Sequence, residues 1–332
     1  MNYLLIVFAM AGLLSACREN EDKGVAMKSE AYNTVPYCAG RVSFLLPEGW
    51  RQRRSVQATF GLEGVGDDGD DIEVVTEEGL SQKNFEEKIL VRTAEIRKSQ
   101  DIDTDVLELK HIVGPQEILF RIKRIGSSYS SELHKLIDGT YVRMSTDSFN
   151  GQFVAAEHRL YDFAKALRSN TGHSAEGGFC IGVISVLQKY SSEAIRVGYE
   201  SSEHSDALLS LDIDTFRPDE GVSLFQRVTG TDSLLNRFGV TSRVIRKRET
   251  KVAGMTAQEW MAWMPADKSS DSGRFLFAVE SRRTKPDRLR PSIHAELETA
   301  RRSTDGARQQ NSLSESEAVI LWDNFVESFA TR

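Results

Sequence analysis

The side chains that most often carry out catalysis or bind metals are present in this sequence, but their spacing fits none of the common reactions. The sequence contains no Gly-x-Ser-x-Gly elbow, no His-Glu-x-x-His motif, no Gly-rich phosphate loop and no Cys-x-x-Cys pair. The six histidines show no metal-ligand spacing; they are His111, His134, His158, His173, His204 and His294. We therefore expect no enzymatic activity, no metal site and no other cofactor.

One acidic run invites a calcium interpretation. Asp67-Asp68-Gly69-Asp70-Asp71 places four carboxylates within five residues, and calcium prefers oxygen ligands. The run lacks the alternating ligands and the distal glutamate of an EF-hand loop. We therefore expect a solvated acidic loop here, with calcium binding as the alternative.

The first of the three cysteines follows an apolar run. Leu4 to Leu14 is almost unbroken in its hydrophobicity and too short to span a membrane. It ends in Leu14-Ser15-Ala16-Cys17, which resembles a bacterial lipobox and implies a signal peptide over residues 1–16 and a lipidated Cys17. Because Arg18 and not aspartate follows the cysteine, we expect the periplasmic face of the outer membrane. A plain secretory signal is the alternative.

The other two cysteines, Cys38 and Cys180, would then face an oxidising compartment. Such a compartment favours a disulfide over two free thiols. The alternative is a pair of buried, reduced cysteines.

Repeated landmarks indicate that the chain contains two copies of one fold unit. The pattern Cys-x-Gly-x-x-Ser begins at Cys38 and again at Cys180, and Gln116-Glu117 returns as Gln258-Glu259 at the same offset of 142 residues. Leu160-Tyr161-Asp162-Phe163 is echoed by Leu321-Trp322-Asp323-Asn324, at an offset of 161. The longer offset predicts an insertion in the second copy, where the sequence turns basic and loop-like from Ser281 to Gln310.

Hydrophobic periodicity predicts an α+β fold with two tandem similar domains. Helices are expected over Ser81 to Ser99, Phe153 to Leu167 and Gly221 to Phe238, and after the capping-box pattern Ser314-x-x-Glu317. The intervening strands include a hairpin around Asp138-Gly139. We expect each domain to be a curved antiparallel sheet with two helices packed on one face. The predicted segments are a tether over 17–35, an N-terminal domain over 36–170, a linker over 171–178 and a C-terminal domain over 179–332.

Charge is distributed unevenly along the chain. The 332 residues carry a net charge of −7, which argues against a nucleic-acid partner. The segment from Arg243 to Arg302, however, contains 14 lysines and arginines and only 8 aspartates and glutamates. The densest basic cluster is a candidate partner-binding site; it comprises Arg282, Arg283, Lys285, Arg288 and Arg290. The alternative is a solvated loop or one that lies near anionic lipid heads.

Together these landmarks resemble a known family. They are Cys-x-Gly-Arg at Cys38 followed by Leu46-Pro47-Glu48-Gly49, the second Cys-x-Gly at Cys180, the segment from Gly254 to Glu259 and the Leu321-Trp322-Asp323 helix. In order and spacing they resemble the type VI secretion immunity lipoproteins that neutralise phospholipase effectors of the fourth lipase class.

The resemblance implies a two-domain periplasmic inhibitor that binds its cognate phospholipase and occludes the active site of that enzyme. Such an inhibitor needs no catalytic residues of its own, and it would meet the membrane only through its N-terminal lipid anchor. The alternative is a cell-envelope lipoprotein that binds a small ligand or a lipid between its two domains. A large apolar pocket would favour the alternative, whereas a polar cleft would favour the inhibitor.

Overall fold

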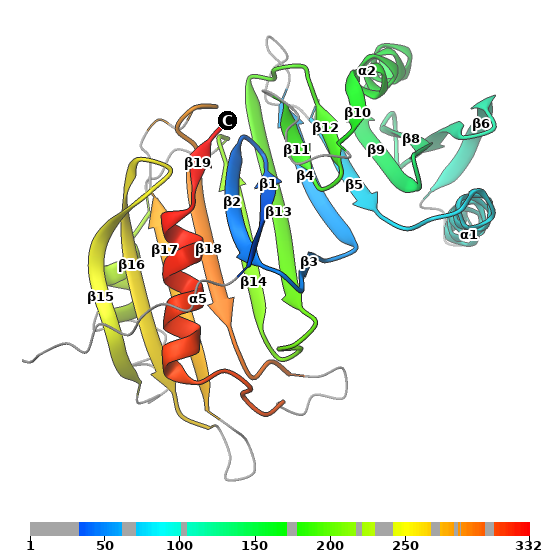
Figure 1. The fold of residues 1–332 in the computed structure, drawn as a ribbon. Helices are drawn as coiled ribbons and strands as arrows, with labels where there is room; N and C mark the ends of the chain where they lie inside the picture. The colour runs from blue at the N-terminus through cyan, green and yellow to red at the C-terminus, as the bar shows by residue number, and fades with distance from the viewer. Residues whose placement is uncertain are drawn as a thin grey trace, which may run out of the picture. The chain divides into compact units, whose positions relative to one another are not determined.

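Antiparallel strands dominate the fold, and the described part of the chain contains four helices that pack against them (Figure 1). The computed structural model describes residues 33–61, 71–100, 105–170, 178–216, 221–229, 242–266, 273–281, 285, 287–302 and 309–332. These residues belong to one compact unit, Tyr32–Arg332. Cys17, the signal peptide and most of the acidic run, Asp67 to Asp70, lie outside the described residues.

The predicted α+β class is confirmed. The strands are β1 (Thr34–Ala39), β2 (Val42–Pro47), β3 (Trp50–Gln52), β4 (Ser55–Gly61), β5 (Ile72–Glu77), β6 (Val106–Gly114), β7 (Glu117–Lys123), β8 (Tyr129–Ile137), β9 (Thr140–Ser148), β10 (Leu167–Ser169), β11 (Phe179–Ile181), β12 (Ile184–Val186), β13 (Ser192–Ser201), β14 (Leu208–Asp214), β15 (Arg243–Val252), β16 (Met255–Met264), β17 (Arg274–Ser281), β18 (Ser292–Glu298) and β19 (Ala330–Thr331). The helices are α1 (Gln82–Gln100), α2 (Phe153–Ala166), α3 (Leu224–Thr229) and α5 (Glu315–Glu327).

One sheet of 13 strands runs through both halves of the chain. Its order is β15-β16-β17-β18-β14-β13-β4-β5-β9-β8-β7-β6, with β3 also paired to β13. The two halves meet where β13 pairs with β4, from Ser192 opposite Gly61 to Arg196 opposite Gln57. The expectation of a separate sheet in each half is therefore wrong, because hydrogen bonds between β4 and β13 continue the sheet across the predicted boundary.

The order of this sheet is the same when it is read inward from either end. From one end it runs through a four-stranded meander, β15 to β18, and then β14 and β13. From the other end it runs through the meander β6 to β9 and then β5 and β4. Two small sheets show the same correspondence between the halves. The last strand of the first half, β10, pairs with β12 of the second half, and the last strand of the second half, β19, pairs with β2 of the first.

The helices cover opposite faces of the sheet, not one face as expected. Phe85 of α1 packs in a cluster with Phe120 of β7. The preceding residue of the same strand, Leu119, lies instead in the main core with Phe163 of α2. In the second half, Leu224 of α3 packs with Trp260 and its neighbours on one face. Successive strand residues point to opposite faces, so the inner strands β7, β8 and β16 are buried on both sides, whereas the edge strands β6 and β15 are largely exposed.

The helix positions follow local signals. Ser81 Oγ accepts a hydrogen bond from the Asn84 backbone N–H (3.2 Å) and so opens α1. Ser314 and Glu317 form the predicted capping box at α5. Of the helix expected over Gly221 to Phe238, the structure describes α3 from Leu224 to Thr229. Residues 230–241 lie outside the described part. Leu167, expected on the second helix, is instead the first residue of β10.

The predicted basic insertion contains a central strand. β18 lies between β17 and β14, and its apolar residues Ile293, Ala295 and Leu297 are buried. The expectation of a loop throughout Ser281 to Gln310 is therefore wrong. Alternation over Ser292–Glu298 was the available signal, and the surrounding charge obscured it.

Candidate partner-binding cleft

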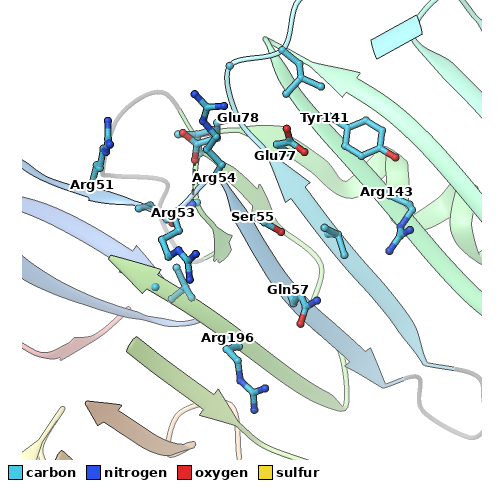
Figure 2. A pocket seen from close by; sticks show the side chains of 18 of the residues that line it. Arg51, Arg53, Arg54, Ser55, Gln57, Glu77, Glu78, Tyr141, Arg143 and Arg196 are labelled. Atoms are coloured by element: carbon cyan, nitrogen blue, oxygen red, sulfur yellow. Dashed lines mark hydrogen bonds between the residues drawn. The ribbon is translucent and has the colours of Figure 1, made fainter. Parts of the chain in front are cut away.

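A cleft of about 1690 Å³ lies on one face of the sheet, where the two halves meet. One wall is α1, and the floor is built from β3, β4, β5, β9, β13 and β14, with the β11–β12 turn at one end. Figure 2 shows arginines and carboxylates from these strands and from the segments that connect them around the space. Both halves of the chain therefore contribute to one polar cleft.

Arginines dominate the floor of the cleft. They are Arg51, Arg53, Arg54, Arg143 and Arg196. Glu200 on β13 is the nearest carboxylate to two of them, at 3.7 Å from Arg51 Nη2 and 3.9 Å from Arg53 Nε. Arg196 is held by Asp212 on the neighbouring strand, with Nη2 2.7 Å from Oδ2. The arginine side chains of the floor thus outnumber the carboxylates beside them.

The α1 wall is fixed by paired charges. Lys88 Nζ lies 2.7 Å from Glu77 of β5. Arg92 donates to both oxygens of Glu132 on β8, at 3.0 and 2.6 Å. These bonds from Glu132 raise the pKa of Arg92 although burial opposes the shift. The charges of this wall are therefore largely neutralised within the protein.

Glu132 and His134 form the buried end of this network. Burial alone would raise the pKa of Glu132, but hydrogen bonds from His134 and Arg92 outweigh it and bring the pKa to about 2. Burial lowers the pKa of His134, whose Nδ1 lies 2.8 Å from the hydroxyl of Tyr141. Burial also raises the pKa of Tyr141. The buried side chains of Glu132, His134 and Tyr141 thus lie beneath α1 and hold Arg92 of the helix in place.

A glycine closes one end of the cleft. Gly182 in the β11–β12 turn has φ +65°, and a Cβ there would lie 2.9 Å from Glu78 Oε1 and closer still to the Gln52 side chain. Gln52 Nε2 donates to Glu78 Oε1 (3.2 Å), and burial raises the pKa of Glu78. The second Cys-x-Gly motif thus brings β12 close to the first half of the chain.

Cys38 and Cys180 form a disulfide, with their Cα atoms 5.9 Å apart. Gly40 N donates to Cys180 O (2.9 Å), and Cys180 N donates to Gly40 O (2.8 Å). The bond therefore joins the β1–β2 hairpin to the β11–β12 hairpin beside the cleft, which Cys38 lines.

The described members of the basic cluster that was expected to bind a partner, Lys285, Arg288 and Arg290, do not line the cleft. Arg282 and Arg283 lie outside the described residues. Lys285 and Arg290 are exposed, and Arg290 Nη2 lies 2.8 Å from Asp287 Oδ2 within its own turn. Arg288 belongs to the same turn. The structure thus brings none of the described members of the cluster to the cleft.

Sequence reasoning did not find the arginines of the floor. Arg51, Arg53 and Arg54 stand within four residues after Trp50, and that local density was a usable signal. Arg143 and Arg196 are separated from them along the chain and join them only through strand pairing. No pattern within one segment could have placed all five together.

The described residues contain no group of three or more His, Cys, Asp or Glu side chains arranged to hold a metal ion. In the same part of the chain, no helix is both long enough and apolar enough to cross a membrane.

The cleft that the two halves of the sheet share is lined by charged side chains and is the candidate binding site of this fold. The family comparison then gives the class of the protein a name. Residues 174–332 match the family model described as the Tle cognate immunity protein 4 C-terminal domain. The resemblance of the sequence to type VI secretion immunity proteins is thereby confirmed.

Solved structures share the fold over most of the chain. The crystal structure of a Tle4–Tli4 complex contains a chain that matches with 19% identity and a TM-score of 0.64, covering 90% of this chain and 97% of that one. The immunity protein TplEi of the type VI secretion system from Pseudomonas aeruginosa matches in its apo form with 18% identity and a TM-score of 0.63, over 90% and 97%. The same protein complexed with a peptide named "L" gives 19% and 0.61, over 90% and 98%. A search of curated proteins finds no match.

Proposed function

We propose that this chain is an immunity protein that binds a type VI phospholipase effector and occludes the active site of that enzyme, which protects the cell that makes both. The observation that carries the proposal is the match of residues 174–332 to the Tle cognate immunity family. The shared fold with a chain of the Tle4–Tli4 complex supports it. Inhibition by occlusion requires only a complementary surface and no reacting group.

The cleft supports a protein partner more than a small ligand or a lipid. Its floor carries five arginines, and a lipid tail would leave these charges without solvent. A second cavity, beside Trp50 and His204, measures about 200 Å³. The larger cleft is lined by many charged side chains, which does not favour the ligand-binding alternative.

We also propose that the protein acts in the periplasm, anchored to the outer membrane through a lipid on Cys17. The apolar run before Leu14-Ser15-Ala16-Cys17 supports this proposal. Replacing Cys17 with serine should abolish both lipid labelling and membrane fractionation. Labelling that survives the replacement would refute the anchor.

The basic cluster of Arg282, Arg283, Lys285, Arg288 and Arg290 remains a proposed rim of the interface. Charges at a rim mainly steer association. Reversing them should slow association and reduce its salt dependence, as stopped-flow binding would show. Unchanged association rates would remove this cluster from the interface and leave the immunity function untouched.

The direct test uses the purified protein and the phospholipase encoded beside it. The protein should show no hydrolase activity of its own and should inhibit the phospholipase at a near-stoichiometric ratio. A lipase of another class provides the control and should remain active. A folded, oxidised preparation that neither binds nor inhibits the neighbouring phospholipase would overturn the proposal.

A further inference from the structure

On the sheet floor of the cleft, five arginines lie beside the carboxylates of Glu77, Glu78 and Glu200, and Arg196 is also paired with Asp212. On the α1 wall, Lys88 and Arg92 are each paired with glutamates at hydrogen-bonding distance. On the floor, Arg51 and Arg53 share the single carboxylate of Glu200 at distances beyond a direct hydrogen bond. Figure 2 shows these arginines spread along the floor, not gathered at one point. An anion lying along the floor would therefore meet several cations in succession.

Arg53 is positioned by the strand beneath it. Its backbone N–H donates to Gly198 O (2.8 Å), and a Cβ at Gly198 would lie 2.9 Å from Arg53 Cδ. Gly198 lies within β13 and has no positive φ, so space for Arg53 is the reason for a glycine here. The side-chain stem of Arg53 lies against the strand, and the side chain as a whole is about half exposed (55%). Holding a charge in place lowers the ordering cost of binding.

The size of the cleft points to a polypeptide segment. Pockets for small molecules measure roughly 300–1,000 Å³, and this cleft is larger, at about 1690 Å³. Planar guanidinium groups bind carboxylates through two parallel hydrogen bonds.

We propose that the cleft receives an extended acidic segment of the effector, with its carboxylates bound by Arg53, Arg54, Arg143 and Arg196. This inference rests on the proposed immunity function and adds the chemistry that the partner must present.

The test compares two double variants with the same change in charge. Arg53→Glu with Arg196→Glu reverses two exposed cations of the floor. Arg97→Glu with Arg124→Glu reverses two exposed cations outside the cleft lining and is the matched control. All four positions are exposed, so both variants should fold, and thermal melting checks this.

Each protein is titrated with a fluorescent oligoglutamate peptide, with an oligolysine peptide and with the effector. We expect oligoglutamate to bind the wild type and the control variant in a salt-dependent manner. The floor variant should bind both oligoglutamate and the effector about tenfold or more weakly, because opposed charges at an interface become repulsive. Oligolysine should not bind the wild type.

Several results would overturn the inference. They are equal binding of oligoglutamate by both variants, equal affinity of both variants for the effector, and binding of the wild type to phosphatidylglycerol vesicles but not to oligoglutamate. Equal inhibition of the effector by both variants would refute the acidic segment and leave immunity intact. A wild type that binds oligoglutamate but inhibits no effector would refute immunity alone.

Discussion

Glu259 shows how one buried charge can connect three elements. It lies in β16 and is fully buried. Its carboxylate accepts hydrogen bonds from Arg246 Nε (2.8 Å) and Arg248 Nε (2.6 Å) of β15 and from Trp322 Nε1 (2.9 Å) of α5. The Gln-Glu repeat marked this residue in the sequence, but its three donor residues come from one neighbouring strand, β15, and one helix, α5, which only the fold brings together. Its role therefore could not be predicted from the repeat.

Replacing Glu259 with glutamine should destabilise the protein, because two arginines would lose their common anion within the core. Removing one partner of a buried ion pair costs about 3–5 kcal/mol, and the partial exposure of Arg248 places the expected loss in the free energy of unfolding at the lower end of that range. Urea unfolding measures it.

The matched control is Glu315→Gln. Glu315 pairs with Arg243 at the surface, where the two side chains are 42% and 57% exposed. Exposed pairs of this kind contribute less than about 1 kcal/mol. Equal losses in the two variants would show that burial of Glu259 does not matter.

Single elements with strong local signals were predictable, and their assembly was not. The hairpin around Asp138-Gly139 follows from its turn residues, which have φ of 46° and 81°. The inner meander strands β7, β8 and β16 are buried on both faces, so their sequences do not show which helix covers which face. For that reason the sequence could not show whether the helices of each half cover the same face of the sheet or opposite faces.

Replacing Gly139 with alanine should weaken the β8–β9 hairpin. A left-handed backbone costs a residue with a Cβ about 1–2 kcal/mol, so the free energy of unfolding should fall by that amount. Thermal or urea unfolding of the variant measures the loss.

Gly114→Ala serves as the comparison for this variant. Gly114 ends β6 without a positive φ, and a Cβ there would meet nothing within 4 Å. Its effect should stay within about 0.5 kcal/mol, as at other open surface positions. A Gly139 variant as stable as the Gly114 variant would contradict the role of backbone conformation.

At the scale of the whole molecule, the mirrored strand order favours our proposal that the halves are copies of one unit. Each hairpin that begins a half pairs with the short strand that ends the other half. The repeated Cys-x-Gly motif predicted two related halves but gave no sign that they would share a sheet. That outcome depends on the edges of β4 and β13, which pair across a long separation in sequence.

Replacing both Cys38 and Cys180 with alanine should reduce stability, because the disulfide closes a loop of 142 residues. The chain-entropy model gives a loss of about 5 kcal/mol for a loop of this length, less any strain in the native bond. Urea unfolding with and without reductant should measure it, and peptide mapping without reduction should find the Cys38–Cys180 peptide.

Cys17→Ser is the control, and it should unfold as the wild type does in both conditions. Free thiols at Cys38 and Cys180 in protein taken from the periplasm would contradict the disulfide. Equal stability of the oxidised and reduced wild type would contradict the contribution assigned to it.

The pairing of β19 with β2 has a consequence for how the chain is made. Ser43 of β2 lies opposite Ala330, and Arg332 N donates to Arg41 O (2.9 Å). The first hairpin to be synthesised thus lacks a neighbouring strand until the final residues have left the ribosome. Contacts this distant in sequence form slowly. The edge of β2 therefore stays unpaired until β19 has been synthesised, and a chain that stops before Ala330 would leave that edge open to another strand.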